Sequence, residues 1–152
     1  MVGPKNFIRT ATQLRKVIDT QGDSLMENAV AQLYEDGTIA RHIKKSVKIY
    51  KERRDNFCNL LTNELDKHIS FKAPDGGMSV WVKFLTVDLI NISELALKKG
   101  LILDSGRKYN TSTHNYNSAR LGFASLNFQE QKRAVEILKI CILECLKKLN
   151  SK

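Results

Sequence analysis

Hydrophobic residues recur at helical spacing in the first part of this chain. The pattern predicts a first helix within residues 4–20, which Pro4 could open because its fixed φ suits the first helical turn. Ser24 and Glu27 are spaced as a capping box, and an apolar stripe follows them. We therefore expect a second, short helix that begins at Ser24 and ends near Tyr34.

A third and much longer helix is predicted next. Asp36 and Gly37 form a stop signal, and Thr38 is a residue type that can cap the helix after it. From Ile39 to about His68 the chain contains neither Gly nor Pro and keeps a helical apolar stripe. This segment is the longest element that the pattern predicts.

Strand patterns appear only after a Pro- and Gly-containing break at residues 73–77. Residues 78–84 alternate between apolar and other side chains, which predicts a strand, and residues 101–103 read as a short buried strand. Residues 119–124 alternate in the same way. We expect these three segments to form one small sheet.

Two helices separate and follow the strands. Asn91, with Glu94 reaching back, is expected to cap a short helix that ends at Gly100. Asn127 and Glu130 form the same capping pattern before a final helix with a long apolar stripe. The order of elements predicts an α+β fold, in which a small three-stranded sheet is covered on one face by the long helix and the C-terminal helix and is preceded by a connecting helix.

Composition agrees with one ordinary globular domain. The chain has 152 residues, of which 42% are hydrophobic and 27% charged, and its apolar runs are shorter than the ~20 residues of a membrane span. Without a signal-peptide pattern at its start, we expect a cytoplasmic protein with no membrane partner. Three cysteines, Cys58, Cys141 and Cys145, lack metal-type spacing with histidine, so we expect reduced core residues and no metal site.

A formal net charge of +9 leaves two interpretations open. Basic residues gather between Arg41 and Arg54, which could be the footprint of a small nucleic-acid-binding protein. The same segment carries apolar residues at helical spacing, so the cations could also be the solvated side of an amphipathic helix. No aromatic stacking platform or glycine-rich basic loop accompanies them, which favours the solvated helix.

Arg120 is the residue whose setting most suggests chemistry. The alternation of Ala119, Leu121 and Phe123 buries one face of its strand, so Arg120 lies on the other face together with Gly122 and Ala124. A guanidinium fork among small residues has room to bind a carboxylate through two parallel hydrogen bonds. The alternative is an arginine on an edge strand whose charge is simply hydrated.

Four patches in fixed order resemble a known family. They are Asp36-Gly37 with Arg41-His42-Ile43-Lys44-Lys45, then Tyr50-Lys51-Glu52-Arg53-Arg54-Asp55, then Pro74-Asp75-Gly76-Gly77-Met78 with Trp81, and finally Ala119-Arg120-Leu121-Gly122-Phe123-Ala124. Together they resemble the C-terminal small domain of fold-type I pyridoxal-phosphate aminotransferases. The similarity is strongest to the aminotransferase-like region of MocR-type GntR transcription regulators.

The resemblance implies roles for five residues. Arg120 matches the arginine that grips the α-carboxylate of an amino-acid substrate or effector. Gly76 and Gly77 would let the backbone approach a ligand or a neighbouring domain, although a simple turn into a strand is an equal alternative. Tyr109 and Asn110 lie in the long polar loop, residues 104–118, that borders the site in the family.

The resemblance also implies what this chain lacks. The family holds pyridoxal phosphate as a Schiff base on a lysine in a Ser-x-Ser-Lys motif, and residues 2–5 resemble the stretch just after that motif. We therefore expect no catalytic residue here, no covalently held cofactor and no activity of the chain alone. Residues 1–36 are expected to be connecting helices from a missing large domain, and residues 37–152 the small domain.

A parent protein follows from the resemblance. It would be a homodimer that binds pyridoxal phosphate in the missing large domain, and the small domain would close over an amino-acid substrate or effector. A MocR-type regulator would contact DNA only through a further N-terminal winged-helix domain. A self-standing class I/II aminotransferase is the alternative parent.

Overall fold

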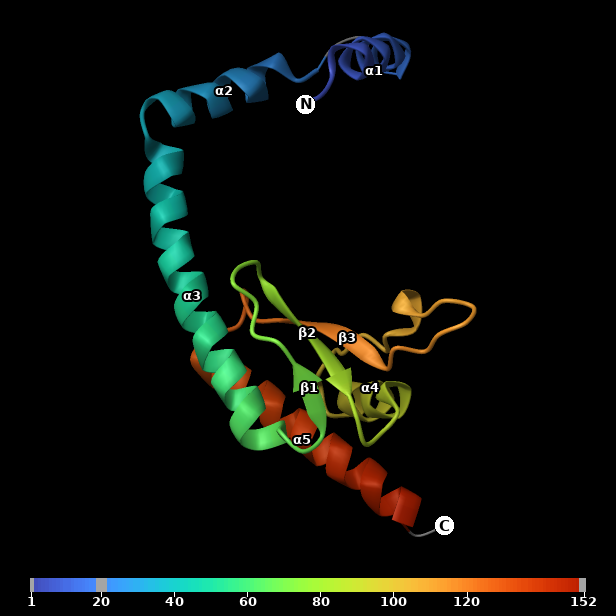
Figure 1. Cartoon of the computed structure of the whole chain (residues 1–152). Helices are drawn as coiled ribbons and strands as arrows, with labels where there is room; N and C mark the ends of the chain where they lie inside the picture. The colour runs from blue at the N-terminus through green and yellow to red at the C-terminus, as the bar shows by residue number, and fades with distance from the viewer. Residues whose placement is uncertain (1, 19–21, 151–152) are drawn as a thin grey trace. The chain divides into compact units, whose positions relative to one another are not determined.

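The computed structural model describes residues 2–18 and 22–150, and contacts divide the chain into two compact units (Figure 1). The first unit extends to Lys45 and the second begins at Ser46. Each unit is described by itself below. This division falls inside the long helix, at a different place from the expected boundary between residues 36 and 37.

The first unit consists of helices that bury little of their surface. Helix α1 spans Lys5–Ile18 and α2 spans Ser24–Glu35, and neither contains a buried residue. Asp23, and not Ser24, caps α2: its side-chain oxygen accepts a hydrogen bond from the Met26 N–H at 3.0 Å. The predicted helix is confirmed, but its cap lies one residue earlier because a carboxylate is the stronger acceptor beside the positive end of a helix.

Helix α3 spans Thr38–Leu65 and confirms the long helix of the sequence pattern. Gly37 precedes it at φ 74°, a conformation that favours glycine. Thr38, the expected cap of this helix, is instead its first residue, and the Thr38 N–H donates to Asp36 Oδ1 at 2.7 Å. Hydrogen bonding from the Thr38 side chain and, to a lesser extent, from the Thr38 N–H lowers the pKa of Asp36 below its ordinary value, because both stabilise the charged form.

The second unit contains one antiparallel sheet in the order β1-β2-β3. Strand β1 spans Ile69–Phe71, β2 spans Ser79–Phe84 and β3 spans Ser118–Gly122. The predicted strands around residues 78–84 and 119–124 are confirmed. The predicted strand at residues 101–103 is wrong: this segment is irregular, and the side chain of Ile102 is 89% exposed.

One face of the sheet is buried against helices. Val80 and Val82 of β2 and Ala119 and Leu121 of β3 belong to a core to which α3, α4 and α5 also contribute. The intervening side chains, Trp81 and Arg120 among them, remain on the other face. Figure 1 shows α5 running behind the sheet in this view. The predicted α+β fold with a sheet covered on one face is therefore confirmed.

Two further helices complete the unit. Helix α4 spans Leu89–Lys98 and is capped by Asp88 instead of the predicted Asn91, because the Asp88 side chain accepts from the Ile90 N–H at 2.9 Å. Helix α5 spans Phe128–Asn150. Its capping box is confirmed: the Glu130 N–H donates to Asn127 Oδ1 at 3.0 Å, and the Asn127 N–H donates to Glu130 Oε2 at 2.7 Å.

All three cysteines are buried and unpaired, as expected of core residues. Burial raises the pKa of each thiol, because desolvation disfavours the thiolate. Within the described ranges no group of three or more His, Cys, Asp or Glu side chains could hold a metal ion. No helix in those ranges is long and apolar enough to cross a membrane.

Candidate functional site

Arg120 projects from β3 on the face of the sheet that the core does not cover. The residues on either side of it, Ala119 and Leu121, are buried, whereas Arg120 itself is exposed. Among the described residues its guanidinium makes no hydrogen bond and no ion pair. A charged fork held on a rigid strand without an internal partner is free to receive an anion.

An aromatic pair lies beside Arg120. The register of the sheet places Trp81 of β2 directly opposite Arg120, so the two side chains are neighbours on one face. Tyr109 packs edge-on against Trp81, with ring centroids 4.8 Å apart and planes at 86°. Trp81 remains 46% exposed and so offers apolar surface next to the cation.

Asp104 and Lys108 complete this group of side chains. Their ion pair links the start and the end of a short turn, and Lys108 Nζ also lies 5.1 Å from the centre of the Tyr109 ring. Asp104 is close enough to Arg120 to feel its charge. We call Trp81, Asp104, Lys108, Tyr109 and Arg120 the Arg120 cluster.

Charge pairing shifts the pKa of two members of the cluster. The Lys108 ammonium and the Gly106 N–H hold the pKa of Asp104 below its ordinary value, and Arg120 adds to this effect. The Asp104 carboxylate in turn raises the pKa of Lys108. Both groups are therefore charged at neutral pH, and the cluster carries one net positive charge, counting Arg120.

A short 3-10 helix, η1 (Arg107–Tyr109), brings Tyr109 to Trp81. Gly106 precedes it at φ 77° and lies against β3: a Cβ there would meet the Ser118 carbonyl oxygen at 2.5 Å. Asn110 follows the helix, and its Oδ1 accepts from the Tyr116 N–H at 3.1 Å. Of the two predicted loop residues, Tyr109 thus joins the cluster, while the Asn110 side chain braces the loop.

Arg120 and Asp104 also line one cavity of about 140 Å³. Its walls are otherwise apolar and come from the 101–103 segment, from β3, from α5, from Phe57 of α3 and from Leu126. Leu101 and Leu103, from the segment that suggested a strand, are partly buried against the core beside this cavity, whereas Ile102 is exposed, and the segment does not extend the sheet. This volume is smaller than a typical ligand pocket, so the cavity is a recess beside the arginine and not an enclosed site.

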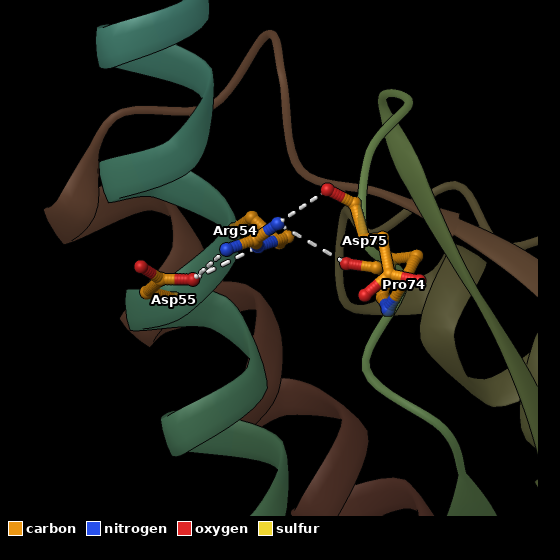
Figure 2. A network of polar contacts seen from close by, with 4 residues as sticks. All are labelled: Arg54, Asp55, Pro74 and Asp75. Atoms are coloured by element: carbon orange, nitrogen blue, oxygen red, sulfur yellow. Dashed lines mark hydrogen bonds and ion pairs between the residues drawn. The ribbon is translucent and has the colours of Figure 1, made fainter.

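Gly76 and Gly77 directly follow Pro74 and Asp75, whose carbonyl oxygens are bound by Arg54 of α3 (Figure 2). Arg54 Nη1 donates to the carbonyl oxygens of Pro74 at 3.2 Å and Asp75 at 2.8 Å, and the same guanidinium pairs with Asp55 at 2.7 Å. Gly77 has φ 86°, and a Cβ at either glycine would meet nothing within 4 Å. The positive φ therefore accounts for the presence of glycine at position 77. The space beside both glycines is open.

The glycine turn borders a second cavity of about 500 Å³, which Val47, Tyr50, Lys51 and Met78 also line. It shares no lining residue with the cavity beside Arg120. The structure thus brings Tyr109 close to Arg120 but places Gly76 and Gly77 at a separate recess of the second unit.

The basic segment between Arg41 and Arg54 divides into two groups. Arg53 and Arg54 are partly buried and donate to backbone carbonyls, Arg53 to Ala124 and Arg54 to the glycine turn. The others are exposed on α3: Arg41, Lys44, Lys45, Lys48 and Lys51. Arg53 and Arg54 therefore connect α3 to distant segments of the second unit, whereas Arg41 bonds only locally, to the Asp36 carbonyl oxygen at 3.1 Å and to Thr38 Oγ1 at 2.9 Å.

Pyridoxal phosphate does not fit the Arg120 cluster as a covalently held cofactor. A lysine that forms a Schiff base needs an accessible neutral amine, which a lowered pKa provides. Lys108 is the lysine of the cluster, and its pKa is raised by Asp104. The cluster can bind an anion and cover it with aromatic surface, but it does not supply the amine nucleophile.

Sequence reasoning did not assign Trp81, Asp104 or Lys108 to the site. Alternation within residues 78–84 would have put Trp81 on the face opposite the core, but only the register places it across from Arg120. The four-residue spacing of Asp104 and Lys108 was a visible signal of an ion pair within one turn.

Comparison with known proteins gives two kinds of relative, although no protein-family profile matches the chain. An uncharacterized HTH-type transcriptional regulator of Bacillus subtilis, YdfD, is 26% identical over 145 residues, which are 95% of this chain and 30% of that protein. Aromatic-amino-acid aminotransferase 1 of Thermococcus litoralis is 25% identical over 144 residues, 94% of this chain and 34% of the enzyme.

A solved structure shows the same fold. The multiple substrate aminotransferase of Thermococcus profundus superposes with a TM-score of 0.85 at 25% identity, over 95% of this chain and 36% of that one. The chain thus spans about a third of the length of the relatives that it matches. It is related both to aminotransferases and to HTH-type transcriptional regulators, and it has the fold of the C-terminal small domain of fold-type I aminotransferases.

Proposed function

We propose that this chain closes an amino-acid-binding site in a larger pyridoxal-phosphate-dependent protein and that Arg120 binds the α-carboxylate of the substrate or effector. The observation that carries the proposal is the unpaired, exposed guanidinium of Arg120 on a rigid strand, beside the aromatic pair. Kinship to aminotransferases supports it.

The cluster suits this role chemically. The guanidinium fork of Arg120 fixes both the position and the orientation of a carboxylate through two parallel hydrogen bonds. The half-exposed ring of Trp81 would shield those bonds from water on one side, and Tyr109 fixes that ring. Shielding strengthens a charge-assisted hydrogen bond because the local dielectric falls.

The cofactor would belong to a large domain beyond this chain. When bound there, pyridoxal phosphate supplies an aldehyde that forms a Schiff base with an amino group and acts as an electron sink. This chain would contribute carboxylate binding and closure. Residues 37–152 would be the moving small domain and residues 1–36 its connection to the large domain, in a homodimeric parent.

For the parent we propose an effector-sensing MocR-type regulator of the GntR family, with DNA bound by a separate winged-helix domain. Relatives named as HTH-type transcriptional regulators support this choice. Relatives named as aminotransferases support the alternative, a self-standing enzyme. Extending the reading frame upstream of Met1 separates the two: a winged helix before an aminotransferase large domain identifies a regulator, and its absence there identifies an enzyme.

Nucleic-acid binding by the exposed cations of α3 is the candidate of another class. A mobility-shift assay with short duplex DNA tests it directly. Binding that falls when Lys44 and Lys48 are both changed to Gln, and that weakens steeply with salt, would favour this candidate over the carboxylate site. We expect no such binding at 150 mM salt. At this ionic strength the Debye length is about 8 Å, so interactions between exposed charges farther apart than this are largely screened.

Nuclear magnetic resonance tests the role of Arg120. The indole N–H signal of Trp81 would be followed during titration with L-phenylalanine, and L-phenylalaninamide, which lacks the carboxylate, serves as the control ligand. We expect Arg120→Gln to weaken carboxylate-dependent binding about tenfold or more, since hydrogen bonds to charged groups contribute ~1.5–3 kcal/mol. Arg120→Lys should restore only part of the affinity because it lacks the planar fork.

The matched control is Lys83→Gln. Lys83 is also exposed on β2, so its removal changes the net charge by the same amount without touching the guanidinium. Equal losses in Arg120→Gln and Lys83→Gln would show that general charge, and not the Arg120 fork, attracts the carboxylate. Binding of L-phenylalaninamide as tight as that of L-phenylalanine would overturn the proposed role.

A further inference from the structure

We propose that Lys108 is a positioning residue that keeps Asp104 from pairing with Arg120 and so leaves the Arg120 guanidinium open to a ligand carboxylate. The effect on ligand binding rests on the proposed function of Arg120, whereas the contact that Lys108 prevents can be observed without any ligand.

Asp104 is an internal competitor for Arg120. Both residues line the same cavity of about 140 Å³, and a carboxylate so placed would suit the guanidinium fork as well as a ligand would. Yet no ion pair within 4.0 Å joins them in the described part of the chain. Other contacts therefore hold this carboxylate away from the Arg120 guanidinium.

The other contacts of Asp104 explain why it does not turn to Arg120. Its Oδ1 accepts the Gly106 N–H at 2.9 Å, and its Oδ2 forms the ion pair with Lys108. Both oxygens are thus engaged within the turn that leads to η1. The Gly106 bond anchors one oxygen to the backbone, and Lys108 is the partner that a single substitution can remove.

Lys108 is itself held over the ring of Tyr109. Its Nζ lies 5.1 Å from the centre of the Tyr109 ring, and Tyr109 packs against Trp81. Cation–π attraction to the ring and attraction to Asp104 therefore act on the same ammonium group. Loss of Lys108 would leave Oδ2 of Asp104 without its ion-pair partner. Arg120, the other cation whose charge acts on Asp104, could then pair with it.

The ligand-free test follows the side-chain Nε–Hε signal of Arg120, assigned by its loss in Arg120→Lys. In Lys108→Gln we expect this signal to move and its exchange with water to slow, because the guanidinium gains a carboxylate partner. The signal should stay in place in Lys83→Gln, which removes an equal charge from the same face. In the double variant Asp104→Asn/Lys108→Gln it should return to the wild-type position.

The binding test uses L-phenylalanine at constant ionic strength, with L-phenylalaninamide as the control. Lys108→Gln should weaken carboxylate-dependent binding about fivefold, the size of an exposed ion pair at its upper range. Lys108→Arg should bind like the wild type because it can still pair with Asp104. The double variant should recover at least the wild-type affinity, because the competing carboxylate is gone.

The double variant decides between two explanations. If Lys108 simply attracts the ligand, Asp104→Asn/Lys108→Gln will bind as weakly as Lys108→Gln, and the proposal fails. An unchanged Arg120 signal in Lys108→Gln overturns it as well, whatever the ligand does. If the Arg120 signal responds as expected but no variant binds the carboxylate, the positioning role of Lys108 stands and the proposed function of Arg120 is the part that fails.

Discussion

Gly106 shows how a single residue without a side chain controls the loop that carries Tyr109. Its φ of 77° is costly for any other residue, and a Cβ would meet the Ser118 carbonyl oxygen at 2.5 Å and Leu89 Cδ2 at 2.8 Å. We expect Gly106→Ala to lower the free energy of unfolding by about 3 kcal/mol, through backbone strain and overpacking. Urea denaturation followed by circular dichroism measures the change.

Gly100→Ala is the matched control for that measurement. Gly100 has a similar φ of 82° at the end of α4, but a Cβ there would meet nothing within 4 Å. Gly100→Ala should therefore lower the free energy of unfolding by about 1 kcal/mol, the cost of backbone strain without overpacking. Equal losses in both variants would mean that the close approach of Gly106 to β3 does not matter for stability.

Asp104 predicts a pH effect on stability. Lys108 and the Gly106 N–H depress its pKa below the ordinary 3.8, so the unfolded chain binds its proton more readily than the folded chain. The stability that the ionised Asp104 carboxylate contributes is fully present at pH values above the ordinary pKa. It is lost as the pH falls through the depressed pKa of the folded state. Urea midpoints measured from pH 5 down to pH 2.5 should fall less steeply in Asp104→Asn than in the wild type. Parallel curves would contradict the predicted coupling.

At the level of residues, the sequence placed Arg120 on the uncovered face of the sheet, and the family resemblance named Tyr109, but neither predicted that Trp81, Asp104 and Lys108 lie with them. Alternation along one strand is enough to place Arg120 opposite the core. Trp81 became its neighbour through strand register, and Tyr109 through a turn that depends on the positive φ of Gly106. Contacts between segments so far apart in the sequence are not encoded in local periodicity.

Gln131 ties two helices and the end of β3 together. It is fully buried on α5, its Oε1 accepts from Asn56 of α3 at 2.7 Å, and its Nε2 donates to the carbonyl oxygens of Arg53, Phe123 and Leu126. We expect Gln131→Ala to lower the free energy of unfolding by about 3 kcal/mol, because buried carbonyls and an amide lose their partners.

Asn56→Ala supplies the comparison for that prediction. It removes one hydrogen bond to Gln131 and leaves the three carbonyl contacts in place. Its cost should be about 1 kcal/mol. Thermal denaturation of both variants measures the two losses of stability. A larger loss in Asn56→Ala than in Gln131→Ala would contradict the prediction, because the contacts of Gln131 with the three carbonyl oxygens would then contribute little.

Whole elements were more predictable than their ends. The long helix α3 and the capping box of α5 follow from local patterns, which tertiary contacts did not override. The caps of α2 and α4 moved to Asp23 and Asp88, because several capping residues stand close together in each stretch. Strand β1 has only three residues, too few for an alternation pattern to show.

The two units of the molecule differ in how much they bury. No residue of α1 or α2 is buried, whereas α3 from Phe57 onward and α5 contribute many core residues. Local opening requires little free energy where few apolar contacts are lost. We expect hydrogen exchange to be fast in α1 and α2 and slow between Val135 and Cys145. Equal protection in both places would contradict this difference.

The exposed apolar residues of α1 predict self-association of the chain. Phe7, Leu14, Val17 and Ile18 are all more than half exposed, and such apolar surface favours a partner. Light scattering at rising concentration should give masses above that of a monomer. Leu14→Glu should reduce them, whereas Leu97→Glu, at a leucine of similar exposure on α4, should not. A monomeric mass at every concentration would contradict the prediction.

Trp81 gives the whole molecule a built-in optical reporter. It is the only tryptophan of the chain, it is half exposed, and it lies across from Arg120 on the same face of the sheet. Fluorescence excited at wavelengths that only tryptophan absorbs therefore comes from one known position. Any anion, domain or partner that covers Arg120 will change the colour or intensity of that emission, so binding at this face can be followed without a label.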